Sequence, residues 1–142
     1  FHDEETFKFQ IGKGDVMREG TDVAIIATGL MVNEAVEAAK TLANEGIDAM
    51  VINMCTIKPL DEELVIEAAK KCGRVITCEE HSIIGGLGEA VCACLSEKCP
   101  TPVKRIGVND VFGFSGPAND LLKEFGLSAE NIVKTAHEFC GK

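Results

Sequence analysis

The chain has 142 residues, of which 14 are basic and 23 acidic, and its formal net charge is −9. A chain of this length forms one domain and buries roughly two-thirds of the surface that its unfolded form exposes. The acidic balance argues against binding to nucleic acid or to an anionic membrane, because clustered basic residues hold both. No run approaches the ~18 apolar residues of a membrane span, and the first ten residues do not resemble a signal peptide. The missing initiator Met indicates a piece of a longer chain.

Seven cysteines are present, an odd number, and no two have the CxxC spacing of zinc and redox motifs. We expect reduced thiols and a cytoplasmic protein. Cys92 and Cys94 lie two residues apart on a predicted helix, so their side chains point in different directions and no metal site is expected there. The cysteines are interpreted as small buried hydrophobic residues.

The first half of the chain alternates between strand and helix patterns. Phe7 and Phe9 alternate with polar neighbours, which predicts a short strand, and residues 12–20 form a glycine-punctuated connection. The continuous apolar run over 23–27 predicts a buried parallel strand. A helix follows, because apolar residues recur at helical spacing up to a C-terminal Gly46; these residues are Val32, Ala35, Val36, Ala39, Leu42 and Ala43.

The second half repeats this alternation. Residues 47–55 predict a strand, and Asp61 is a suitable N-cap for a helix that ends at Gly73. A third buried strand is expected over 74–80, a helix over 87–95 and a fourth strand over 102–108. Two helices close the chain, one from Ser115, Gly116 and Pro117 to Gly126, the other capped by Ser128 and carrying Ile132, Val133, Ala136 and Phe139.

These elements predict a three-layer α/β domain with a mixed, mainly parallel sheet and helices on both faces. The N-terminal strand precedes the first crossover, so we expect it at the sheet edge in antiparallel orientation. We assign residues 1–142 to a single domain, with 1–6 as a linker.

The segment "EEHSIIGGLGEA", residues 79–90, is the candidate site, because it follows a predicted strand and ligands gather at the carboxyl ends of parallel strands. Glu79, Glu80 and His81 could serve proton transfer, and the glycine turn before a helix could bind a phosphate. However, the glycines do not form a dinucleotide fingerprint, and Glu89 would repel a phosphate. A packing or subunit-contact turn is favoured, formed by Glu80, His81, Gly85, Gly86 and Gly88, with Gly86 as the glycine expected to need a positive φ or a close approach.

The other polar residues do not define a catalytic site. His2 lies near the terminus and His137 on the last predicted helix, so position alone supports no Ser–His–Asp or Cys–His arrangement. Asp110 and Ser115 are interpreted equally well as turn and cap residues.

Three segments, residues 12–65, 79–91 and 102–133, resemble the C-terminal domain of transketolase, and the resemblance runs from about residue 7 to 139. It is closest to the form in which transketolase is divided between two polypeptides. The motifs "KPLDEE" and "EEH..GG.G" also resemble 1-deoxyxylulose-5-phosphate synthase and the beta subunits of 2-oxoacid dehydrogenases, whereas "FGFSG" followed by "LLKEFGLSAENI" favours transketolase. The family often has an acidic or amide residue at the position of Phe114.

The resemblance implies a five-stranded mixed sheet and a structural role in dimer and domain contacts. The complete enzyme would transfer a two-carbon ketol unit between sugar phosphates, as in the pentose phosphate pathway, with thiamine diphosphate and magnesium as cofactors. It implies no catalytic, cofactor-binding or metal-binding residue in this chain, which alone should be inactive. The implied partners are the missing thiamine-binding domains and a second copy of the complete enzyme. The alternatives are the synthase, a dehydrogenase beta subunit, or an independent phosphate-binding module.

Overall fold

The computed structural model describes residues 10–82, 85–108 and 126–142. Five strands form one sheet in the order β1-β3-β2-β4-β5. Their bounds are β1 (Asp15–Arg18), β2 (Val23–Ala27), β3 (Ala49–Asn53), β4 (Val75–Ser82) and β5 (Val103–Val108). β1 pairs with β3 in antiparallel orientation, and the remaining neighbours are parallel. The predicted mixed sheet with an antiparallel edge strand is therefore confirmed.

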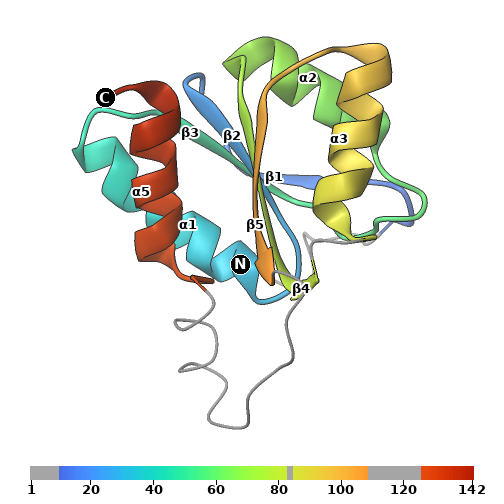
Figure 1. The fold of residues 1–142 in the computed structure, drawn as a ribbon, viewed down its shortest axis with the longest axis horizontal. Helices are drawn as coiled ribbons and strands as arrows, with labels where there is room; N and C mark the ends of the chain where they lie inside the picture. The colour runs from blue at the N-terminus through green and yellow to red at the C-terminus, as the bar shows by residue number, and fades with distance from the viewer. Residues whose placement is uncertain (1–9, 83–84, 109–125) are drawn as a thin grey trace, which may run out of the picture.

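The described helices cover both faces of the sheet (Figure 1). They are α1 (Met31–Asn44), α2 (Glu62–Cys72), α3 (Leu87–Lys98) and α5 (Ala129–Cys140). α1 and α5 lie together on one face, while α2 and α3 lie on the other. The predicted helix over 115–126 falls mostly outside the described residues, as do Phe7, Phe9, Asn109, Asp110 and Phe114.

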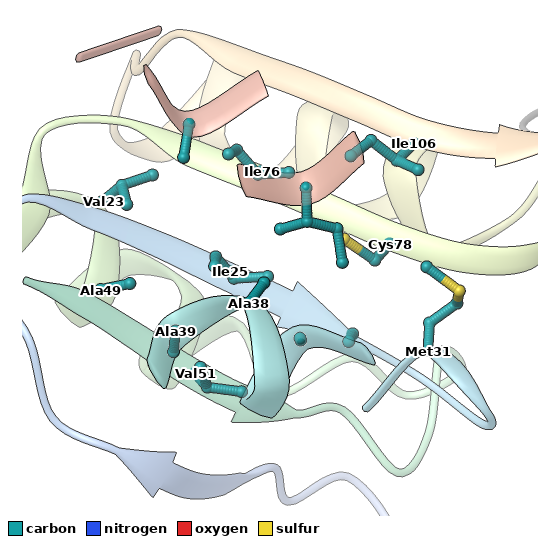
Figure 2. Packing of buried hydrophobic residues seen from close by; sticks show 14 of the residues in the cluster. Val23, Ile25, Met31, Ala38, Ala39, Ala49, Val51, Ile76, Cys78 and Ile106 are labelled. Atoms are coloured by element: carbon teal, nitrogen blue, oxygen red, sulfur yellow. The ribbon is translucent and has the colours of Figure 1, made fainter. Parts of the chain in front are cut away.

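Each face of the sheet carries its own apolar cluster. Alternate residues of the central strands point to opposite sides, so Ile25, Val51 and Ile76 face α1 and α5 (Figure 2), whereas Ala24 and Ile52 face α2 and α3. All five of these side chains are fully buried. Burying one such valine or isoleucine side chain stabilises the fold by about 1.5–3 kcal/mol. Because both faces of the central strands are buried, their sequences are continuous apolar runs.

Two helices begin, and one of them also ends, where their sequences predict. Asp61 Oδ1 accepts a hydrogen bond from Leu64 N at the start of α2, and Ser128 Oγ accepts one from Asn131 N at the start of α5. α2 ends at Gly73, whose φ of +75° belongs to the left-handed region that glycine adopts most readily. Predicted caps and observed caps agree at these positions.

The edge strand β1 corrects one prediction. The sequence was interpreted as a connection over residues 12–20, but Asp15–Arg18 pair with β3 through a register shift between Val16 and Arg18. Two long-range hydrogen bonds hold the entry to this strand: Gly12 N donates to Thr56 Oγ1 (3.0 Å) and Gly14 N donates to Asp61 Oδ2 (2.9 Å). The strand therefore depends on distant partners that its own short sequence does not reveal.

Each of the two edge strands carries charged side chains. Arg18 of β1 donates through Nη1 to the carbonyl of Ala49 (2.6 Å) and to Asp48 Oδ1 (3.1 Å). On β5, the Lys104 ammonium lies 5.7 Å from the centre of the Phe139 ring of α5. Charged side chains and a register shift at an edge oppose the pairing of a further strand.

Candidate functional site

The carboxyl ends of β2, β3, β4 and β5 meet at one edge of the sheet, which we call the carboxyl edge. The chain leaves β2 toward β3 on one side, while β4 lies on the other side of β2, so the strand order reverses between β2 and β4. In open α/β sheets this reversal point is where ligands bind. The predicted segment from residue 79 onward starts here, because Ala27 of β2 is paired with Cys78 of β4.

Glu79 is buried at the start of α3. Its carboxylate accepts hydrogen bonds from Leu87 N (2.9 Å to Oε1) and Gly88 N (2.7 Å to Oε2), and the residue has no exposed surface. A helix start presents unpaired N–H groups and a partial positive charge, which a carboxylate or a phosphate can complement. At α3 the chain itself supplies this anion, so these two N–H groups are already occupied.

The neighbouring Glu80 lies at the start of α1. Its carboxylate accepts longer bonds from Leu30 N, at 3.4 Å to Oε1 and 3.3 Å to Oε2. Gly29 makes room for this carboxylate, because a Cβ on Gly29 would lie 2.2 Å from Glu80 Oε1. Two successive acids of β4 thus reach two different helix starts, one in the interior and one at the surface.

The remaining described helices follow the same pattern. Asp61 fills the start of α2, as described above, and Glu34 Oε2 accepts a hydrogen bond from Ala129 N (2.7 Å) at the start of α5. A carboxylate of the chain therefore occupies the start of every helix in the described ranges. An incoming phosphate at any of these four helix starts would have to displace an internal anion.

The glycine turn differs in detail from its prediction. Gly86 has φ −104° and ψ −155°, an extended conformation, so the expectation of a positive φ at Gly86 is wrong. Gly85 carries the positive φ, +74°, and its N–H bonds to the Glu89 carboxylate. The close approach is at Gly88, where a Cβ would lie 2.7 Å from Arg105 Cδ and 3.0 Å from Thr77 Oγ1.

His81 lies on β4, and its side chain falls outside the described part of the structure. The sequence did not predict that Glu79, two residues before His81, fills the start of α3. Period-two alternation could have indicated it, because Thr77 and Glu79 share the face that carries α3. A carboxylate on that face, shortly before a glycine turn and a helix, is positioned to fill the helix start.

Three of the seven cysteines are buried as the sequence predicts, and the other four are partly buried. All seven have free thiols, and Cys72, Cys78 and Cys94 are buried. Burial raises the pKa of the Cys72 thiol to about 11 and raises the pKa of Cys78 further. Across the described ranges, no three His, Cys, Asp or Glu side chains are grouped so that they could hold a metal ion.

Two open grooves lie away from the glycine turn. One, of about 660 Å³, runs between β5 and α5 beside Lys104 and Phe139. The other, of about 280 Å³, lies between residues 57–60 and α3. Neither is lined by Glu80, His81 or the turn glycines. Among the described residues of the predicted segment 79–90, Ala90 alone borders one of these two grooves, the one of about 280 Å³.

The fold and this edge define an open α/β domain whose four described helix starts are filled by its own acids. The comparisons give its family: residues 12–132 match the model "Transketolase, C-terminal domain", and the chain belongs to that family.

The sequences of two curated relatives match most of this chain. The "6-deoxy-6-sulfo-D-fructose transketolase subunit SqwH" of Clostridium sp. strain MSTE9 is 52% identical over 96% of the chain and 42% of the relative. The "1-deoxy-D-xylulose-5-phosphate synthase" of Heliobacterium modesticaldum is 43% identical over 96% of the chain and 21% of the relative. The chain thus spans less than half the length of each.

A solved structure described as "Split gene transketolase, inactive beta4 tetramer" has the same fold. It is 50% identical, with a TM-score of 0.89 over 93% of this chain and 43% of the other. The resemblance to the C-terminal domain of divided transketolases is confirmed, and the synthase alternative is no better supported.

Proposed function

We propose that this chain is the structural C-terminal segment of a thiamine-diphosphate-dependent transketolase, which transfers a two-carbon ketol unit between sugar phosphates. Its role is to complete the enzyme's domain and dimer contacts, and the reaction takes place in the preceding domains. The proposed protein is cytoplasmic and forms a homodimer in the complete enzyme, without nucleic acid or membrane partners. Of the helices described, none has the length and apolarity to cross a membrane.

The filled helix starts carry this proposal. Thiamine diphosphate would need N–H donors and a magnesium ion for its diphosphate, and the described residues do not fit that group. At the start of α3, Glu79 already uses the N–H groups of Leu87 and Gly88, and its negative charge would repel a diphosphate. This local chemistry supports a structural role and disfavours the independent phosphate-binding module.

The proposal is tested by titrating the chain with thiamine diphosphate and Mg²⁺ in a calorimeter. We expect no saturable binding below about 100 μM, an affinity that a dedicated cofactor site would easily reach. A thermal-shift series with sugar phosphates and nucleotides tests the module alternative, because any ligand of the folded state raises the melting temperature. Saturable binding in either experiment contradicts the structural role.

A chimeric subunit tests whether this chain can support ketol transfer in a complete enzyme. The matching C-terminal segment of the Clostridium subunit is replaced by residues 1–142 of this chain, which share 52% identity with it. With the other subunit of that enzyme present, we expect ketol transfer by the chimera and none by the isolated chain. If the chimera is folded and carries the cofactor but shows no transfer, the chain does not perform the proposed role.

A further inference from the structure

Two large hydrophobic side chains are exposed in the described part of the chain, and both lie at the carboxyl edge. Ile11 is 72% exposed and Leu30 is 61% exposed. Leu30 follows the end of β2, and Ile11 precedes β1, whose first residue Asp15 pairs with Asn53 at the end of β3. Because β1, β3 and β2 are successive strands, about 10 Å separates β1 from β2. Ile11 and Leu30 therefore both border the carboxyl edge, next to β1 and β2 respectively.

The internal structure gives neither side chain a role. Leu30 lies at the N-cap of α1 and makes no side-chain cap, a position where Ser, Thr, Asp and Asn are preferred. Glu80 supplies the acceptor for Leu30 N instead. Ile11 lies beside Gly12, whose N–H is bonded to Thr56 Oγ1. Both apolar side chains are held on hydrogen-bonded backbone and directed to the surface.

The direction of the chain at β1 determines the edge to which a preceding domain would be joined. β1 is antiparallel to the other strands, so the chain enters it from the carboxyl edge. In the relatives, the matched region is the C-terminal domain and amounts to 42% of the Clostridium subunit, so most of such a subunit precedes it. A region preceding residue 10 would be tethered to this edge, because residues 10–14 lead from it into β1. Such a tether raises the effective concentration to about the millimolar range, so a small apolar contact suffices for docking.

We propose that Ile11 and Leu30 form the docking surface for the thiamine-binding region that precedes this domain in the complete enzyme. The inference rests on the proposed function. The docked region should present an apolar patch to Ile11 and Leu30. Next to that patch it should carry a basic side chain for Glu80, whose present bonds at 3.3–3.4 Å are long and solvent-exposed.

Amide hydrogen exchange tests the surface without any substitution. Exchange at residues 28–31 is compared between the 142-residue chain and the chimeric subunit described above. We expect at least about tenfold slower exchange in the chimera, because docking excludes water from the start of α1. Equal exchange in both proteins overturns the proposal. Slowing that appears in the isolated chain as its concentration rises assigns the surface to a second copy and also overturns it.

Substitutions supply the second measurement. Leu30→Gln in the chimera should restore fast exchange at residues 28–31, and it should shift the melting temperature of the isolated chain by less than about 2 °C. Ala43→Gln is the matched control, an exposed apolar residue near the opposite end of α1, and should leave the protection intact. Protection that survives Leu30→Gln refutes the assignment. A chimera that is active but unprotected at residues 28–31 leaves the proposed function standing and refutes only the docking surface.

Discussion

We expect truncation of Glu79 and of Glu80, two adjacent residues of β4, to lower the free energy of unfolding by very different amounts. Glu79→Ala removes both acceptors of Leu87 N and Gly88 N in an interior where the side chain has no exposed surface. Each buried donor left unpaired costs about 1–3 kcal/mol, and the lost charge at the helix start costs up to about 2 kcal/mol more. The substitution also removes the cost of burying a charged carboxylate, which offsets part of this loss. We expect a net loss of about 3–5 kcal/mol.

Glu80→Ala is the matched control, because it removes the same side chain from the next residue of the same strand. Its bonds to Leu30 N are longer than 3.2 Å and exposed, so water can replace the carboxylate. We expect a loss below about 1 kcal/mol.

Urea unfolding followed by circular dichroism at pH 7 measures both free energies of unfolding. The m-value should be the same in the two variants, since the surface exposed on unfolding is similar. Equal costs for the two variants, or a cost below about 1 kcal/mol for Glu79→Ala, would refute the reasoning from burial and bond length.

Three further predictions concern other parts of the fold. Gly20→Ala should cost about 3 kcal/mol in urea melts, because its Cβ would lie 2.3 Å from the Ala49 carbonyl carbon, whereas Gly46→Ala should cost about 1 kcal/mol since its φ is +86° but its surroundings are open; similar costs would contradict this. His137 Nε2 lies 2.6 Å from Glu45 Oε1, which raises the pKa of the histidine above 6.5. The stabilising contribution of protonated His137 is therefore fully present below pH 6.5 and lost as pH rises through the folded pKa, so Glu45→Gln should lower the melting temperature at pH 5.5 and not at pH 9. The buried thiol of Cys78, with its raised pKa, should resist iodoacetamide at pH 8 until urea unfolds the chain, and rapid labelling detected by peptide mass spectrometry under native conditions would show that the strand is accessible.

The central sheet could be predicted because its strands are buried on both faces. Val23–Ala27 is a continuous apolar run for this reason, and the helices that flank it keep their 3.6-residue period. β1 could not be predicted in the same way. Its four residues are half-buried and flanked by glycines, and its pairing with β3 spans more than thirty residues of sequence. Such a strand depends on tertiary contacts rather than on its local pattern.

The candidate site could be located but not resolved in detail. The segment after β4 does lie at the carboxyl edge, as strand polarity requires. The sequence could not decide which glycine takes the positive φ, because that depends on the path of the turn: Gly85 does, and Gly86 does not. Nor did it identify Glu79 as the internal anion, since an acid near a strand end is usually solvated.

The protection of both sheet edges against further strand pairing affects how this domain can be joined to other domains in a gene. With Arg18 and a register shift at β1 and Lys104 at β5, the sheet resists the addition of a foreign strand. A unit of this kind does not depend on a particular polypeptide to protect its edges. The region that matches this chain makes up 42% of the Clostridium subunit and 21% of the Heliobacterium synthase. Fission and fusion of reading frames can therefore move this segment between enzymes without creating an aggregation-prone edge.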